Sequence, residues 1–369
     1  MKRIAIINNE CFRDPDIALI EILQNDYEID YYVILDKEGV ADIEYLKSIT
    51  RDFKNFRLYP VNGIYRRRSL KYAALSCSIL KEIKKRQYYK ILTGIKEDIF
   101  MSLLFFLFVK RSSTIYMLHD AEIHPYKGVD LTKLIGSYTD KIFIYYAKTI
   151  MLFSKEQLEI LKSRYPNCKA AAINKPCIFY GASSIDKPRI EKQCRFLFFG
   201  NISYYKNIEV LIRASERLNK HFHGRFTVSV IGRESYKEWR NSIETPSVFN
   251  LDIRGFSDKE IPNIFESHHF LVLPYKQVTQ SGPLTLSLQY HIPPIASNLG
   301  IFKSCIKNGK NGFLFDSHDE YELENVMKKC IQLNGEEYNE MRCEVAKTND
   351  IFLNKQLIRN QLLTIISRL

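Results

Sequence analysis

The sequence predicts an α/β protein built from two parallel β-sheets, each flanked by helices. Short apolar runs of strand length alternate with longer helix-like patterns, and this alternation ends and then restarts near the middle of the chain. Strands that alternate with helices form parallel sheets, so a repeated alternation indicates two domains of similar design. The length of 369 residues is comfortable for two domains.

The first half begins with an apolar run and continues as alternating strands and helices. The strand-like runs are Arg3–Ile7, Ile29–Leu35, Phe56–Pro60, Tyr89–Thr93, Thr114–Leu118 and Ile150–Phe153. The helix-like segments between them include Asp16–Gln24, Ser69–Arg86, Glu97–Lys110 and Lys155–Arg164. Residues 181–193 have few large apolar side chains and contain Gly, Ser and Pro, which predicts the connection between the domains.

The second half repeats the alternation. Its strand-like runs are Phe196–Phe199, Phe226–Ile231, Phe249–Arg254, Phe270–Leu273, Pro294–Ala296 and Gly312–Phe315. Its helix-like segments are Ile208–Leu218, Asp258–Glu266, Leu284–Tyr290 and Glu320–Leu333, and residues 350–369 form a last helical pattern. We therefore expect two Rossmann-like domains, 1–180 and 194–349, with a central cleft and with ligands at the carboxyl ends of the strands.

The composition is that of a soluble, cytoplasmic globular protein. Hydrophobic residues make up 46% of the chain and charged residues 26%. The eight cysteines include no C-x-x-C pair, which argues against a zinc site and a disulfide framework. The chain turns polar after Ile7, unlike a secretory signal, and its longest apolar run, Ile99–Val109, is too short to span a bilayer.

The net charge of +12 concentrates in the first half, where Lys and Arg alternate with aromatic residues between Tyr65 and Tyr89. An anionic membrane surface, nucleic acid and a solvated basic face are the alternatives. No nucleic-acid-binding motif accompanies the charge. We therefore expect no nucleic-acid partner, and the inner face of the membrane is one candidate location.

The most informative segment is the polar turn Thr279, Gln280, Ser281 and Gly282, which connects an apolar strand to an apolar helix. A helix N-terminus offers unpaired N–H groups and the positive end of the helix dipole, both of which favour a phosphate. Small residues at this point let an anion approach the backbone. The turn predicts a site for the diphosphate of a nucleotide-sugar, and an ordinary βαβ crossover is the alternative.

Two further signals lie at predicted strand ends. A buried strand ends at Gly200, and a short loop leads to Lys206 at the start of the next helix. A lysine there is electrostatically unfavourable unless an anion is bound, so Lys206 is a candidate phosphate ligand rather than a solvated residue. His119 and Asp120 follow a central strand of the first domain, where His119 could bind a sugar hydroxyl; His124 is a weaker candidate.

Other patterns predict no metal site. Asp14 and Asp16 form an Asp-x-Asp pair, but their place between the first strand and an apolar helix favours N-cap and first-turn roles. The sequence contains no H-E-x-x-H pattern, no P-loop, no nucleophile elbow and no complete G-x-G-x-x-G motif. We expect neither a metal nor another cofactor.

Together, the segments FFGNISYYKNIEVLI, NLDIRGFSDKEIPNIFESHHFLVLPY and YMLHDAEIHP resemble the motifs of the retaining glycosyltransferases of family 4 (GT4), which have the GT-B fold. The resemblance is strongest over Arg195–Asp316. It implies a hexosyltransferase that uses a nucleotide-diphosphate sugar and a saccharide or lipid-linked acceptor, in surface polysaccharide or glycolipid synthesis. It also implies that the helix at 350–369 crosses back to the first domain.

The resemblance assigns roles to matching positions of the second domain. Lys206, Ser281 and Gly282 would hold the donor diphosphate, and the backbone near Gly255 and Phe256 would meet the base. In the first domain, His119 would face the transferred sugar.

Departures from the family pattern accompany these matches. Asn201 stands where relatives usually have an arginine, and Val278 and Leu286 replace a pair of glutamates. The sequence Thr-Gln-Ser-Gly resembles one branch of the family, in which Thr279 or Gln280 would contact the donor hexose. The loop Asn8–Asp14 contains no glycine, although many relatives have a glycine-rich loop there.

The resemblance implies transfer with retention of anomeric configuration. No Asp or Glu stands out as a covalent nucleophile or as a paired acid and base, so we expect front-side attack assisted by the leaving diphosphate. Lys206 and His119 are then the catalytic candidates. Two alternatives remain: a GT-B-like epimerase that acts on the nucleotide-sugar alone, and an inactive GT-B module that binds membranes or polyanions.

Overall fold

The computed structural model describes residues 1–35, 43–61, 65, 69–96, 98–122, 131–182, 190 and 192–367, without the side chains of 131–133. These residues divide into two compact units. The first unit comprises the described residues of Met1–Ile123, Gly128–Ile178 and Lys355–Leu369, and the second comprises those of Phe179–Asn354. The predicted connection at 181–193 lies mostly outside the described residues.

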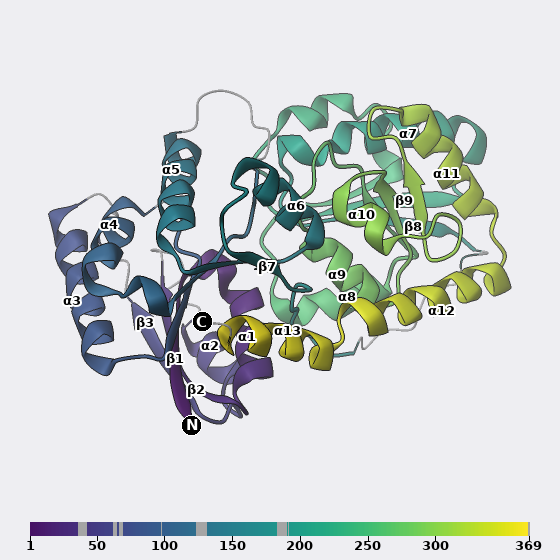
Figure 1. Ribbon diagram of the computed structural model, residues 1–369. Coiled ribbons are helices and arrows are strands. Elements are labelled where there is room, and N and C mark those ends of the chain that lie inside the picture. The colour runs from purple at the N-terminus through teal and green to yellow at the C-terminus, as the bar shows by residue number, and fades with distance from the viewer. Residues whose placement is uncertain are drawn as a thin grey trace. The chain divides into compact units, whose positions relative to one another are not determined.

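The first unit is built on a parallel sheet of seven strands in the order β3-β2-β1-β4-β5-β6-β7 (Figure 1). The strands are β1 (Lys2–Asn9), β2 (Tyr27–Ile34), β3 (Phe56–Val61), β4 (Lys90–Thr93), β5 (Thr114–Met117), β6 (Thr149–Leu152) and β7 (Ala170–Ala172). The central strands are buried on both faces, which explains why they read as continuous apolar runs in the sequence.

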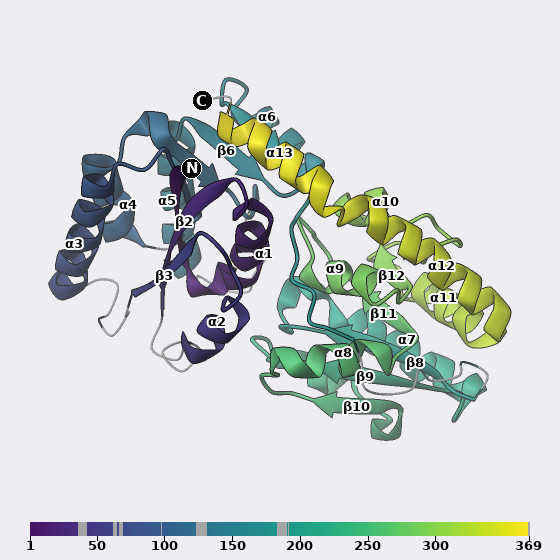
Figure 2. The same ribbon diagram turned by 90° about the horizontal axis from the view of Figure 1, so that it is seen from below.

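Helices cover both faces of this sheet (Figures 1 and 2). One core contains side chains of α1 (Arg13–Leu23), α2 (Ile43–Ile49) and α13 (Lys355–Ser367). The other contains side chains of α3 (Leu70–Arg86), α4 (Ile99–Phe108), α5 (Leu131–Tyr146) and α6 (Lys155–Arg164). Single-turn 3-10 helices precede α1 (η1, Glu10–Phe12) and β5 (η3, Arg111–Ser113).

The second unit contains a parallel sheet of six strands in the order β10-β9-β8-β11-β12-β13. The strands are β8 (Cys194–Phe199), β9 (Phe226–Ile231), β10 (Phe249–Asp252), β11 (Phe270–Leu273), β12 (Pro294–Ser297) and β13 (Phe313–Phe315). In both sheets the strand order reverses once, between β1 and β4 and between β8 and β11. Such a reversal point is where an open α/β sheet offers room for a ligand at its carboxyl edge.

The helices of the second unit also lie on both faces of its sheet. A large core joins one face to α7 (Ile208–Phe222), α11 (Glu320–Gln332) and α12 (Gly335–Phe352). On the other face, Phe199 of β8 packs edge-on against Phe265 of α8 (Ile261–Glu266), with ring centroids 4.9 Å apart. The remaining helices are α9 (Gly282–Gln289), α10 (Gly300–Cys305) and the 3-10 helices η4 (Tyr204–Lys206), η5 (Glu238–Ser242), η6 (Pro246–Val248) and η7 (Asp258–Glu260).

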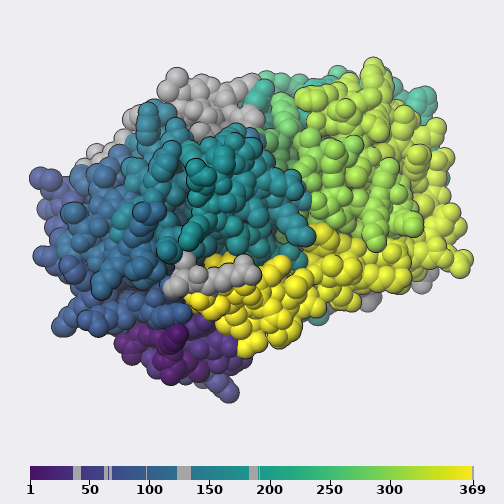
Figure 3. All heavy atoms as spheres, in the orientation of Figure 1, coloured from purple at the N-terminus to yellow at the C-terminus, as the bar shows by residue number. Residues whose placement is uncertain are grey.

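The last helix, α13, belongs to the first unit although it follows α12 of the second. Its apolar side chains, among them Ile358 and Leu362, enter the core beside α1. Arg359 forms an ion pair with Asp26 and Lys355 forms one with Glu21. The space-filling view shows the yellow C-terminal residues against purple N-terminal ones (Figure 3). The chain thus leaves the second unit after Asn354, at the break between α12 and α13.

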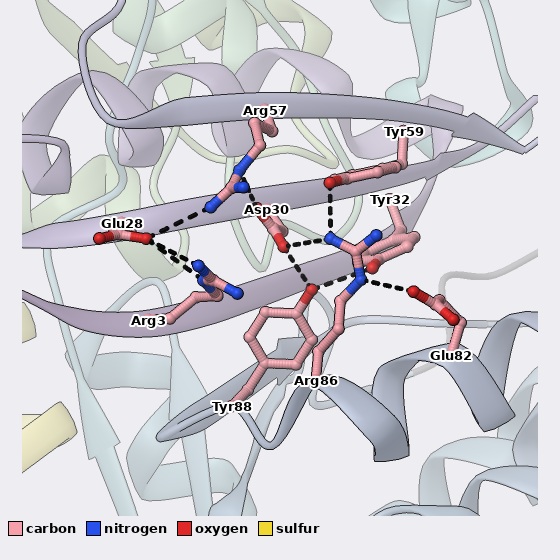
Figure 4. Close-up of polar contacts among 9 residues, drawn as sticks. All are labelled: Arg3, Glu28, Asp30, Tyr32, Arg57, Tyr59, Glu82, Arg86 and Tyr88. Carbon is pink, nitrogen blue, oxygen red and sulfur yellow. Dashed lines mark hydrogen bonds and ion pairs between the residues drawn. The ribbon is translucent and has the colours of Figure 1, made fainter.

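A buried charge cluster ties three strands of the first unit to the end of α3 (Figure 4). The carboxylate of Asp30 on β2 is fully buried. It pairs with Arg57 of β3 at 3.0 Å and with Arg86 of α3 at 3.1 Å, and it accepts a hydrogen bond from Tyr88 at 2.5 Å. A buried charge is tolerated only when it is paired in this way, so the cluster fixes β2 against its neighbours.

The structure contains elements that the sequence did not predict. Strand β7 is a run of three alanines, which have low strand propensity. Helix α5 contains Gly136, Ser137 and Thr139, which weaken the helical signal. In the part of the chain described here, no helix is both long and apolar enough to cross a membrane. All eight cysteines are free thiols.

Candidate functional site

The residues singled out in the second half meet at the carboxyl edge of the second sheet. Gly200 follows β8, Gly232 follows β9, Gly255 follows β10, and the turn 279–282 lies between β11 and α9. The loops after β8 and β11 are joined by a hydrogen bond from the Lys276 N–H to the Tyr205 carbonyl, at 2.8 Å. These loops flank the point where the strand order reverses.

Two glycines bring the loops after β8 and β9 into contact. Gly200 and Gly232 have φ angles of +98° and +145°, which residues other than glycine rarely adopt. A Cβ on Gly232 would overlap with the carbonyl group of Gly200. The Gly200 turn therefore depends on a second glycine that the sequence analysis missed. The signal was present, because Val-Ile-Gly at the end of β9 repeats the pattern Phe-Phe-Gly at the end of β8.

Lys206 lies just before its helix rather than at the first helical residue. It ends η4, and Asn207, in the left-handed conformation, is the N-cap of α7. A Cβ on Gly200 would lie 3.3 Å from the Lys206 Nζ and 3.6 Å from Cγ of Pro283 in the first turn of α9. The structure thus brings Lys206, the Gly200 turn and the start of α9 together.

The ammonium group of Lys206 is buried without a compensating carboxylate. The residue is 6% exposed, and no ion pair to it occurs among the described residues. The ring of Tyr275, which is also buried, has its centroid 5.4 Å from the Nζ atom. Burial lowers the pKa of Lys206 to about 8. A cation held in this way is poised to gain free energy from a bound anion.

The start of α9 has the geometry that an anion requires. Ser281 is the N-cap, and its hydroxyl accepts a hydrogen bond from the Leu284 N–H at 3.2 Å, so the hydroxyl proton can be donated elsewhere. A Cβ on Gly282 would have no neighbour within 4 Å, so the space beside this backbone is open. Thr279 is buried and Gln280 is half-buried beside the cap.

The loop after β10 carries the residues expected to meet a base. The ring of Phe256 packs on Phe199, with centroids 4.5 Å apart. The guanidinium of Arg233, which follows Gly232, lies against Gly255, because a Cβ there would be 2.8 Å from Nε. Arg233 is exposed and is a second residue that the sequence analysis missed.

The three positions that depart from the family pattern are Asn201, which is hydrogen-bonded, and Val278 and Leu286, which are buried. The amide of Asn201 donates a hydrogen bond to the Ser235 hydroxyl at 3.3 Å. Val278 and Leu286 are buried, with exposed fractions of 9% and 8%. Because both residues are apolar, neither presents a polar side-chain group to a ligand.

His119 is buried at the reversal point of the first sheet. It is 4% exposed and stacks on Phe12, with ring centroids 3.6 Å apart and planes 3° from parallel. A Cβ on Gly94 would lie 2.9 Å from its Nε2. Burial, opposed by Asp120 and assisted by Lys175 and Lys96, lowers the pKa of His119 to about 3. The imidazole is therefore neutral at physiological pH.

Asp120, the residue after His119, is held by a neighbouring lysine. Its carboxylate pairs with Lys96 at 3.5 Å. Lys175, which follows β7, is a residue that the sequence analysis missed, and burial lowers its pKa. His124 lies outside the described residues.

The Asp-x-Asp pair lies in the first turn of α1, as predicted, but neither residue is the N-cap, which is Phe12. Asp16 is buried and accepts hydrogen bonds from Asn8 and Tyr31, and burial raises its pKa. Asp14 pairs with Arg13. Over the described ranges, no three His, Cys, Asp or Glu side chains form a group that could hold a metal ion.

Comparison with known proteins shows that the second unit is similar to a family of glycosyl transferases. The sequence profile of "Glycosyl transferases group 1" matches residues 182–348. The chain is 26% identical over 146 residues to D-inositol 3-phosphate glycosyltransferase from Thermobifida fusca (strain YX), a match that covers 37% of this chain and 34% of that relative. The chain thus spans about a third of the length of this curated relative.

Solved structures share the fold over the whole chain. Anabaena HepE, in complex with UDP-glucose, has a TM-score of 0.73 at 16% identity, with all of both chains covered. S. aureus TarM, in a complex that contains UDP, has a TM-score of 0.73 at 12% identity with the same coverage. Sucrose-phosphate synthase from Thermosynechococcus elongatus has a TM-score of 0.71 at 11% identity, and 100% and 99% of the two chains are covered. The predicted GT-B fold, with two parallel sheets flanked by helices, is confirmed.

Proposed function

We propose that this chain is a retaining glycosyltransferase that moves a hexosyl residue from a nucleotide-diphosphate sugar to a saccharide or lipid-linked acceptor, in surface polysaccharide or glycolipid synthesis. One observation carries the proposal: a buried ammonium group without a carboxylate partner, on Lys206, lies beside the open start of α9. The match of residues 182–348 to group 1 glycosyl transferases supports it.

The second unit supplies the donor contacts in this proposal. The Lys206 ammonium, the Ser281 hydroxyl and the Gly282 N–H bind the diphosphate. Each is a donor near the start of α9, where the helix dipole favours negative charge. The base lies against Gly255 and Phe256, with Arg233 beside it.

In this proposal, the side chains that contact the donor sugar differ from those of relatives that have two glutamates. Val278 and Leu286 offer no carboxylate, so Thr279 and Gln280 are the polar side chains nearest to the capped helix start. Asn201, already bonded to Ser235, contributes neutral hydrogen bonds in place of an arginine's charge.

Catalysis in this proposal depends on stabilising the leaving diphosphate. As the bond from the anomeric carbon to the diphosphate oxygen breaks, negative charge grows on the diphosphate, and Lys206 and the start of α9 lie where that charge develops. The diphosphate oxygen accepts the proton of the acceptor hydroxyl, which attacks from the same face. Configuration is thereby retained without a protein nucleophile.

His119 contributes a neutral hydrogen bond to the transferred sugar in this proposal. With a pKa of about 3, its imidazole carries no charge at neutral pH, so it can bind a hydroxyl but cannot act as a cationic acid. Asp120 contributes on the acceptor side through its pair with Lys96. Transfer requires no metal, so EDTA should leave the rate unchanged.

The substitution Lys206→Ala tests the assignment. Loss of one charge-stabilising donor typically costs about 2.7–4 kcal/mol in the transition state, so turnover of the donor should fall by roughly a hundredfold or more. UDP release from UDP-glucose, with a mixture of saccharide acceptors, measures the rate. Lys220→Ala, in the last turn of α7, is the matched control, because Lys220 is exposed and distant in sequence from the site.

An unchanged rate in the Lys206→Ala protein would contradict the proposal. Omitting the acceptor separates transfer from epimerisation, since an epimerase converts the nucleotide-sugar without one. A protein that binds no UDP in calorimetry, with the control variant behaving identically, would instead favour the inactive membrane- or polyanion-binding module.

A further inference from the structure

A cavity lies in the first unit, at the sheet edge opposite His119. It has a volume of about 970 Å³ and is lined by residues that precede β5, β6 and β7 and by the ends of α5 and α6. Strands of a parallel sheet all begin at one edge, so this cavity and the carboxyl-edge residues are at opposite ends of the strands. We name it the basic pocket after its charged lining residues, which are Lys110, Arg111, Lys148, Arg164 and Lys169.

The positive charges of the basic pocket are largely uncompensated. Of the described residues that line the cavity, none is acidic. Arg164 pairs with Glu122, which lies outside the lining. The other cations of the pocket have no carboxylate at ion-pair distance within the described ranges. Cations that face one cavity raise its positive potential and so favour binding of an anion there.

A further lysine lies buried behind the pocket. Lys90 is 3% exposed, and its ammonium donates a hydrogen bond at 3.1 Å to the carbonyl of Ser112, a lining residue. Burial, and then repulsion from Lys148 and Lys2, lowers the pKa of Lys90. The fold therefore places a further lysine at this edge of the sheet, bonded to the backbone of the pocket.

The wall of the pocket is aromatic as well as basic. Tyr145 and Tyr165 meet edge to face, with ring centroids 5.8 Å apart, and both line the cavity. Tyr145 is 71% exposed. The Tyr146 hydroxyl bonds to the Val109 carbonyl and so joins the ends of α5 and α4. Cations beside exposed apolar groups suit a ligand that has a charged group and an uncharged body.

We propose that the basic pocket binds a phosphate-bearing ligand, at a site separate from that of the donor. Arginine and lysine are the side chains that bind phosphate oxygens, and the cavity is much larger than a bare ion requires. The phosphate group has two possible sources, a free phosphorylated compound or the headgroup of an anionic lipid. The inference depends on the first unit alone and does not require the proposed transferase activity.

The test compares two double variants of the full chain that lose the same charge. The pocket variant is Lys110→Gln with Lys169→Gln; both lysines are exposed, so the fold does not depend on them. The control variant is Lys54→Gln with Lys155→Gln, two exposed lysines of the first unit that lie outside both the pocket and the basic segment Tyr65–Tyr89. Circular dichroism verifies that both variants are folded.

Two probes distinguish the sources of phosphate. Calorimetry with inorganic pyrophosphate, in the presence of saturating UDP, measures binding of a free anion. Flotation with phosphatidylcholine vesicles, with and without phosphatidylglycerol, measures headgroup binding at low salt. We expect the pocket variant to lose at least tenfold in affinity for one probe while the control variant stays within twofold of the unchanged protein.

The results with the two probes either identify the source of the phosphate group or overturn the proposal. Loss confined to pyrophosphate identifies a free phosphorylated ligand, and loss confined to the anionic vesicles identifies a lipid headgroup. Equal behaviour of the pocket and control variants with both probes overturns the proposal, because the charge would then act through the whole surface and not through this cavity.

Discussion

At the scale of the residue, the proposed donor site depends on the environment of Lys206. In the sequence it is one lysine among 54 basic residues. In the structure it is buried against Tyr275, beside two glycines and a capped helix start, and burial lowers its pKa to about 8. An ammonium group in this environment is most stable with an anion in contact.

The pKa of Lys206 predicts how UDP binding depends on pH. The ammonium is present below pH 8 and is lost as the pH rises through 8, so the affinity for UDP should fall about tenfold between pH 7 and pH 9. Calorimetric titration across this range measures the change. Lys206→Arg keeps its charge throughout, so its affinity should be flat; an equally flat profile for the unchanged protein would refute this interpretation.

At the scale of the element, the carboxyl ends of β8 and β9 must approach closely to form the site. Because Gly232 has no side chain, its backbone can lie against the Gly200 carbonyl group. Gly200 itself lies close to Lys206 and Pro283. The position of Lys206 relative to α9 therefore depends on two backbone segments and not on Lys206 alone.

This contact predicts that Gly232→Ala weakens UDP binding by at least tenfold, because the new methyl group forces the two turns apart. Gly224→Ala is the matched control. Gly224 also has a positive φ, +73°, but a Cβ there would meet no atom within 4 Å, so that variant carries backbone strain without the clash. Similar UDP affinities for the two variants would mean that the close approach is unimportant.

At the scale of the whole molecule, two units of the same design have different contents at their carboxyl edges. The second holds Lys206 beside α9, and the first holds the neutral His119 beneath Phe12. The single tryptophan, Trp239, is buried in the core of the second unit. Its fluorescence therefore reports unfolding of that unit alone.

Donor binding by the second unit predicts a selective stabilisation. UDP at a hundred times its dissociation constant should add about 2.7 kcal/mol to the unfolding free energy of the unit that binds it. The urea midpoint measured by Trp239 fluorescence should therefore rise. Circular dichroism reports unfolding of both units and so provides the comparison. If UDP moved the dichroism midpoint but not the fluorescence midpoint, the donor site would have to lie in the first unit.

The sequence by itself determined the two sheets, most of their strands and the start of α9 at the turn 279–282. Buried parallel strands are continuous apolar runs, and Ser281 before an apolar segment is a local cap signal, so both are readable without tertiary contacts. It did not predict β7 or α5, because alanines, glycine and hydroxyl residues give weak local signals that packing overrides.

Only the tertiary structure determined the burial, the pKa and the neighbours of the candidate residues. Burial without a counter-charge, which gives Lys206 its lowered pKa, depends on Tyr275, which follows β11, as well as on Gly200 in the loop of Lys206 itself. The loop without glycine after β1 places Phe12 on His119. Burial, assisted by Lys175 and Lys96 and opposed by Asp120, keeps the histidine neutral. The basic pocket likewise joins three segments that are separate in the sequence, 110–112, 144–148 and 164–169. Local sequence encodes periodicity and caps, whereas burial and charge balance depend on residues that only folding brings together.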